Sequence, residues 1–228
     1  MFDPKYQPWT GGGEHFSFLN QPQAAKKNYL MFCKSLAPLL DKEYLQRLWD
    51  LESGFGELMQ IKMRQMWREK LGLERFDADV FNELMALMVE TSVDYTLFFR
   101  ELSNIPDDVY ALTSSFYKDA CGDRELMQRW EKWLVRWRTL VNADDKKIKE
   151  KTAAKMKKVN PKYTLRQWLL VPAYKGAENG DFNPIYELQE VMCNPYDEQL
   201  ASIQKKYYKK MPTEFFDVAG ISHLSCSS

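Results

Sequence analysis

The stretch RELMQRWEKWLVRWRTLV, residues 124–141, decides the fold class. Apolar residues recur in it every three or four positions, and charged residues fill most of the positions between them. This period is typical of an amphipathic α-helix with one buried face. We therefore predict a helix in the core of a helical protein, with an inward-facing set made of Leu126, Trp130, Trp133, Leu134, Trp137, Leu140 and Val141.

Helical periods also fill the sequence before this stretch. Pro22 stands where a helix tolerates proline best, and Asn20 is a candidate cap for that helix. Asp41 can cap a second helix. We expect the second helix to break over residues 53–56, to resume, and to end at Gly72.

Shorter helices are expected in the rest of the chain. Asp79 is expected to open one helix, and Ser92 or Asp94 the next. Beyond the tryptophan-rich stretch, four prolines are expected to separate short helices, namely Pro161, Pro172, Pro184 and Pro195. No apolar and polar alternation is long enough to predict a sheet. The predicted fold class is all-α.

Three regions are predicted along the chain. Residues 1–20 mix prolines, glycines and isolated aromatics without a period, so we expect an irregular arm there. Residues 21–208 form the predicted helical domain, and residues 209–228 an extended C-terminal tail that contains Cys226.

Composition excludes several classes of partner. The chain has 32 basic and 32 acidic residues and a formal net charge of zero, so no global field attracts nucleic acid or acidic lipid. Its apolar runs are far shorter than the roughly 20 residues that cross a bilayer. We expect neither a nucleic-acid nor a membrane partner. The scattered cysteines fit reduced intracellular thiols, and they are Cys33, Cys121, Cys193 and Cys226.

The sequence has no recognisable nucleotide or metal motif. Gly11-Gly12-Gly13 lacks the Gly-Lys-Ser/Thr of a phosphate loop, and Gly54-Phe55-Gly56 lacks the third glycine of a dinucleotide fingerprint, so both are predicted turns. His15 and His223 lie at opposite ends without metal-ligand spacing. We predict no catalytic, cofactor-binding or metal-binding residue within the chain.

Several short motifs occur in an order that resembles the selenoprotein O family over nearly the whole chain. They are Phe2-Asp3-Pro4, Asn20-Gln21-Pro22, Lys70-Leu71-Gly72-Leu73, the run from Asp94 to Ser103 (DYTLFFRELS), Asn160-Pro161, Leu165-Arg166, Gly180-Asp181-Phe182, Pro195-Tyr196 and the final Leu224-Ser225-Cys226-Ser227-Ser228.

The resemblance implies a fold, an activity and partners. Members of the family look like protein kinases but transfer AMP from ATP to serine, threonine or tyrosine hydroxyls of proteins, a reaction called AMPylation. Their ATP and magnesium ligands precede the motif matched by Phe2-Asp3-Pro4. The chain thus corresponds to the helical C-lobe of a kinase-like (pseudokinase) fold. Alone, it is expected to lack the ATP and metal site and to be inactive.

The resemblance also implies partners and a location. The partners would be the N-terminal kinase-like part and the protein substrates. The location would be intracellular, mitochondrial in a eukaryote and cytoplasmic in a bacterium. An alternative interpretation is a stand-alone helical scaffold or interaction module without catalysis. Upstream coding sequence with a glycine-rich loop and a lysine would favour the enzyme.

Cys226 is the candidate redox residue, because some family members carry selenocysteine at the equivalent position. There it is thought to form a regulatory disulfide with the activation segment, yet residues 2–18 contain no cysteine. Three alternatives remain: Cys226 pairs with Cys33, Cys121 or Cys193, it pairs with a cysteine outside this chain, or it is a free thiol.

Other charged groups have structural interpretations. Asp94 is expected to cap a core helix that contains a structural ion pair. Arg166 could tie the tail region to a helix through forked hydrogen bonds, although the sequence names no carboxylate partner. The lysine-rich run over residues 146–158 is expected to be a solvated helix face, because acidic residues lie beside it and no aromatic residue interrupts it.

Overall fold

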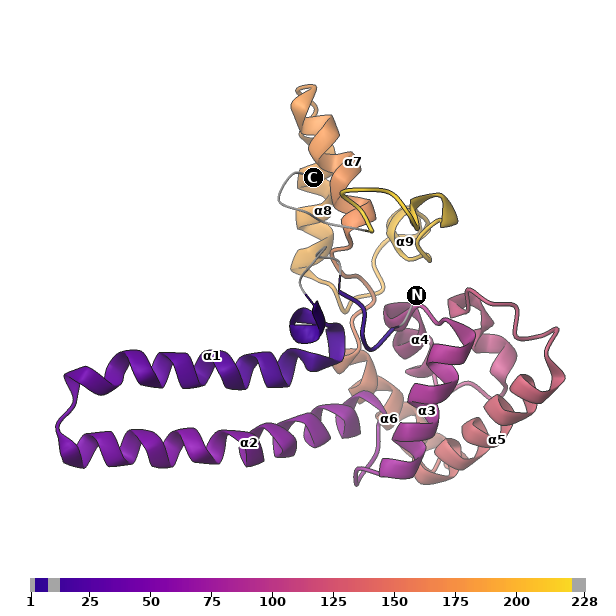
Figure 1. Cartoon of the computed structure of the whole chain (residues 1–228). Helices are drawn as coiled ribbons and strands as arrows, with labels where there is room; N and C mark the ends of the chain where they lie inside the picture. Colours follow the sequence, from indigo (N-terminus) through magenta and orange to yellow (C-terminus); the bar gives the residue numbers. More distant parts are fainter. Residues whose placement is uncertain (1–2, 8–12, 223–228) are drawn as a thin grey trace. The chain divides into compact units, whose positions relative to one another are not determined.

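The computed structural model describes residues 3–7 and 13–222, and over these ranges the protein is helical (Figure 1). No strand occurs in the described part of the chain, where a single bridge joins Val93 and Phe116. The all-α prediction is confirmed. Its assignment as a kinase-like lobe stays a prediction, as do the boundaries at residues 20 and 208.

The chain divides into two compact units. We call residues 3–67 the hairpin unit and residues 68–222 the core unit. The hairpin unit contains the short 3-10 helices η1 (Gly13–Phe16), η2 (Phe18–Asn20) and η3 (Ala37–Leu39), the helix α1 (Gln21–Leu36) and most of α2 (Lys42–Lys70). Helices α1 and α2 run side by side in opposite directions (Figure 1).

Local sequence explains the start of both long helices. Pro22 occupies the first turn of α1, as predicted. Asn20 stands at the N-cap position, but its side chain donates to the carbonyl of Glu14 and makes no cap. Asp41 accepts a hydrogen bond from the Tyr44 amide at 3.3 Å and begins α2, as predicted.

The predicted break over residues 53–56 is wrong, because α2 continues through both glycines. A helical glycine costs only about 1 kcal/mol relative to alanine, and packing against α1 offsets this cost. Phe55, between the two glycines, stacks on Tyr29 of α1 with ring centroids 5.0 Å apart.

The core unit contains the remaining helices. They are α3 (Ala78–Thr91), α4 (Tyr95–Leu102), η4 (Val109–Ser115), α5 (Arg124–Leu140), α6 (Lys146–Val159), α7 (Gln167–Glu178), α8 (Asn183–Cys193), α9 (Ala201–Tyr207) and η5 (Thr213–Phe215). An aspartate side chain caps each of α3, α4, α5 and α6 by accepting from backbone amides in the first turn. The cap of α3 is Asp77, so the prediction that Asp79 opens this helix is wrong by two residues.

The tryptophan face of α5 forms the centre of the core unit. Trp130, Trp133 and Trp137 have no exposed surface, and each indole N–H donates a hydrogen bond. The acceptors are the Thr91 hydroxyl and the carbonyls of Val80 and Leu71, at 2.8–2.9 Å. The predicted buried face is confirmed except for Leu140, which ends the helix and is 41% exposed.

Glycines and prolines shape the ends of the helices. Gly72 has φ +66°, and the Leu73 amide reaches back to the Arg68 carbonyl, so Gly72 ends α2 as predicted. Pro184 lies in the first turn of α8, where proline is favoured. Pro172 lies inside α7, so the prediction that it separates two helices is wrong.

Candidate functional site

Asp94 is the centre of a buried polar cluster in the core unit. Its carboxylate caps α4 by accepting from the Leu97 amide at 3.1 Å. Arg166 donates two parallel hydrogen bonds to it, from Nη1 to Oδ2 at 2.6 Å and from Nη2 to Oδ1 at 2.9 Å. The Asp94 side chain is 5% exposed. The predicted cap is confirmed, and the predicted fork of Arg166 has Asp94 as its acceptor.

Tyr117 connects this ion pair to the C-terminal region. Its hydroxyl lies 3.1 Å from Asp94 Oδ2 and accepts from the Met211 amide at 2.9 Å. Lys210 donates to the Phe116 carbonyl, and Phe216 packs edge-on against the Tyr117 ring. Burial, and then the nearby charge of Asp94, raise the pKa of Tyr117, so the hydroxyl stays protonated and donates to the carboxylate.

Arg100 forms a second cluster near the other end of α4. The guanidinium is almost fully buried and donates to the carbonyls of Lys157 and Asn160 and, at 2.6 Å, to Glu198 Oε1. Lys162 binds the other oxygen of Glu198. Desolvation alone would raise the pKa of Glu198, but hydrogen bonds from Lys162 and Arg100, with their positive charges, lower it to about 2.

Lys70 and Asn160 form a third contact between distant segments. Lys70 Nζ donates to Asn160 Oδ1 at 2.8 Å and lies over the Phe99 ring, 4.5 Å from its centroid. The Asn160 amide nitrogen donates to the Lys70 carbonyl and to the Ser103 hydroxyl. Burial lowers the pKa of Lys70 to about 8.

We call the three clusters together the polar network. It brings together residues from four of the short motifs found in the sequence, which supplied Lys70, Asp94, Arg100, Asn160 and Arg166. A fifth motif takes part through its backbone, because the Pro195 carbonyl accepts from the amides of Lys162 and Tyr163. The network joins α4 to the end of α2, to the end of α6 and the segment that follows it, and to the C-terminal region.

Sequence reasoning missed four members of this arrangement. Glu198 and Lys162 complete the Arg100 cluster, Tyr117 completes the Asp94 cluster, and Tyr208 donates to Glu101 Oε1 at 2.6 Å. Glu198 is 98 residues from Arg100 and belongs to no helix, so no local period points to it.

The polar network holds separate segments of the chain together. The donors of Arg166, Arg100 and Lys162 are directed at internal carboxylates and carbonyls. A phosphate-handling site needs such cations aimed at its substrate. Within the described ranges, no three His, Cys, Asp or Glu side chains are grouped to hold a metal ion.

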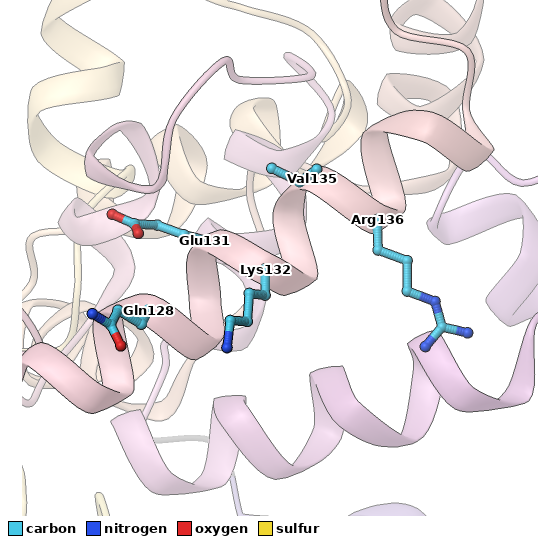
Figure 2. Close-up of a pocket in the computed structure, with 5 residues that line it drawn as sticks. All are labelled: Gln128, Glu131, Lys132, Val135 and Arg136. Atoms are coloured by element: carbon cyan, nitrogen blue, oxygen red, sulfur yellow. The ribbon is translucent and has the colours of Figure 1, made fainter.

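Two surface hollows lie away from the network. One, of about 380 Å³, follows α5 and is lined by Gln128, Glu131, Lys132, Val135 and Arg136. Figure 2 shows Lys132 and Arg136 projecting to the same side of α5. The other, of about 370 Å³, lies between α8 and α9, and Glu187, Glu190 and Asp197 are among its lining residues.

The remaining candidate residues have separate locations. Cys226 and His223 lie outside the described residues, as does most of Gly11-Gly12-Gly13, and nothing tests the redox prediction. Cys33 is buried, whereas Cys121 and Cys193 are exposed. Most lysines of residues 146–158 are exposed, which confirms the solvated face. Among the described helices, none is long and apolar enough to cross a membrane.

Comparison with known proteins places the chain in a class and then in a family. The Protein nucleotidyltransferase YdiU of Flavobacterium johnsoniae is 30% identical across the whole chain and 45% of its own length. Proteins of the same name from Azoarcus sp. and Xanthomonas euvesicatoria are 33% and 34% identical across the whole chain and 44% of their own lengths. The relatives are thus protein nucleotidyltransferases.

The family described as Protein adenylyltransferase SelO matches residues 1–193. The chain belongs to the SelO family, as the short motifs predicted. It spans somewhat less than half the length of the curated relatives that it matches.

Proposed function

We propose that this chain is the C-terminal helical part of a protein adenylyltransferase, which transfers AMP from ATP to serine, threonine or tyrosine hydroxyls. In this proposal a separate kinase-like part holds ATP and magnesium and is the chain's first partner. The family match supports the activity, and the coverage of 44–45% of the relatives' lengths supports the division of labour.

The observation that carries the proposal is the use of the motif residues in the polar network. The charged side chains of these motifs bind groups on other segments of the chain and are largely or almost fully buried. They are Lys70, Asp94, Arg100 and Arg166. Groups that stabilise a transferring phosphoryl group must instead face it. A role in holding the helical part rigid beneath a catalytic part accounts for this arrangement.

The direct test measures transfer of labelled AMP. The 228-residue chain is incubated with magnesium, a mixture of candidate acceptor proteins and ATP labelled in its α-phosphate. We expect no labelled protein. The same chain joined to the complementary N-terminal part of the Flavobacterium johnsoniae relative is expected to transfer the label, whereas that N-terminal part alone is not.

Two outcomes would contradict the proposal. Labelling by the 228-residue chain alone would show that it contains a complete site. A folded chimera that binds ATP but transfers no label, beside an active full-length relative, would favour the alternative of an interaction module. The apolar outer face of α2, described below, is the observation in favour of that alternative.

A redox role for Cys226 is a separate proposal. An exposed thiol has an ordinary pKa of about 8.5 and oxidises slowly at neutral pH. Mapping of disulfides after mild oxidation tests the pairing. Because Cys33 is buried and Cys121 and Cys193 are exposed, a pair formed within the chain is expected at one of the exposed thiols. Retention of a free Cys226 thiol would count against the role.

A further inference from the structure

One face of α2 exposes a row of apolar side chains. Tyr44 is 53% exposed, Leu51 67%, Leu58 55% and Ile61 54%. A neighbouring face of the same helix packs against α1, because Phe55 stacks on Tyr29 and a Cβ at Gly56 would lie 3.7 Å from Lys26 Nζ. The exposed row lies beside this packed face, and more than half of each of its side chains stays uncovered by α1. We call it the outer row.

The spacing of the outer row is that of a coiled-coil seam. Exposed Arg47 and Gly54 stand between the apolar residues of the row, so that positions 44, 47, 51, 54, 58 and 61 alternate in steps of three and four. This 3.5-residue period keeps one narrow stripe facing a partner helix. A helix that only covers a core has a broader apolar stripe. The period indicates that the occupant of the outer row is another helix.

The charges along α2 select the direction of that helix. Residues 42–57 contain four carboxylates and two cations, whereas residues 58–68 contain three cations and no carboxylate. A second α2 that runs in the opposite direction would place its basic half beside the acidic half of the first. Charge complementarity of this kind fixes orientation at helix interfaces.

We propose that two copies of this chain associate through the outer rows of α2, with the two helices antiparallel. In the register centred near residue 56, Leu51 of one copy faces Ile61 of the other, and Gly54 faces Leu58. Apart from its chain neighbours and the backbone of its own helix, no atom lies within 4 Å of the position that a Cβ would take at Gly54. The leucine of the second copy fits into that open space.

The same register pairs charges beside the apolar seam. Asp50 of each copy lies next to Arg64 of the other, because Asp50 precedes Leu51 and Arg64 precedes position 65, where the next step of four after Ile61 continues the seam. The apolar seam has only four layers, so the expected association is a monomer–dimer equilibrium that shifts toward dimer as concentration rises. It is independent of the proposed transfer activity.

The first test is the mass of the 228-residue chain in solution, measured by sedimentation and light scattering over a range of concentrations. We expect a dimer at high concentration. Leu58→Glu is expected to weaken association by about a hundredfold, because it would bury an unpaired charge. Leu39→Glu is the matched control, since Leu39 is 79% exposed and lies outside the outer row, and it should leave the dimer unchanged.

The second test asks whether the dimer forms through the outer row of α2 and in this register. Asp50→Arg is expected to weaken the dimer by about tenfold, and adding Arg64→Asp is expected to restore it. A chain that stays monomeric at all concentrations would assign the outer row to a different polypeptide and overturn the proposal. So would a dimer that Leu58→Glu leaves intact. Circular dichroism of each variant checks that α2 remains helical.

Discussion

The hairpin unit and the core unit use the same helical period to different ends. In the core unit, the apolar face of α5 is buried, and its three tryptophans form hydrogen bonds at the centre of the unit. Among the described residues of the hairpin unit, only Ser17, Ala24, Cys33 and Trp67 are buried. An apolar period therefore predicts that a helix needs a partner, and the partner need not lie in the same chain.

The largest expected effect comes from emptying the centre of the core unit. Trp133→Ala should lower the free energy of unfolding by about 3–5 kcal/mol, because it leaves a cavity and removes the hydrogen bond to the Val80 carbonyl. Denaturant unfolding followed by circular dichroism measures it. Val135→Ala, on the exposed side of the same helix, should change the value by less than about 0.5 kcal/mol. Equal costs at both positions would refute the assignment of the core.

The next effect concerns the buried ion pair. Arg166→Met should cost about 3 kcal/mol, because it leaves the Asp94 carboxylate buried without its cation. Arg166→Lys should recover only part of this loss, since a lysine cannot form the fork. The free energy of unfolding of both variants decides the point. A methionine variant as stable as the unmodified chain would show that the ion pair between Asp94 and Arg166 does not stabilise the core unit.

Two glycines offer a matched comparison between the units. At Gly72 a Cβ would lie 2.6 Å from Met156 Sδ, and the φ of +66° disfavours any side chain, so Gly72→Ala should destabilise the core unit by about 2 kcal/mol. Gly54 is helical with open space around it, so Gly54→Ala should stabilise α2 by about 0.5–1 kcal/mol. Thermal unfolding of the two variants should shift in opposite directions, and shifts of the same sign would contradict this assignment.

The last expected effect is a pH dependence at Lys70, smaller than those of the core and the ion pair. Its folded-state pKa of about 8 lies below the ordinary 10.5, so folding disfavours the charged form. The cost of burying the charge is present below pH 8 and is relieved as the pH rises toward 10.5. Relative to Lys70→Met, the unmodified chain should therefore gain about 1–2 kcal/mol of stability across that window. Parallel pH curves for the two proteins would contradict the lowered pKa.

Much of the core unit could be predicted from the sequence, because it depends on local patterns. The tryptophan face of α5, the cap at Asp94 and the turn at Gly72 each follow from residues within one or two helical turns. The period fails only at Leu140, where the helix ends and its neighbours no longer cover the side chain.

The partners in the polar network could not be predicted, because they depend on tertiary distance. Asp94 and Arg166 are 72 residues apart, and each would suit many oppositely charged residues in the chain. The predicted break in α2 fails for a related reason. Glycine propensity is a local quantity, and packing against α1 outweighs it.

The stacked indoles of α5 give the protein an internal optical probe. The rings of Trp130 and Trp133 are nearly perpendicular with centroids 5.8 Å apart, and those of Trp133 and Trp137 are parallel at 5.9 Å. Chromophores this close share their electronic excitation, and the perpendicular pair gives that shared state a handedness. The aromatic circular dichroism of the unlabelled chain should therefore carry an exciton signal that vanishes when this centre comes apart.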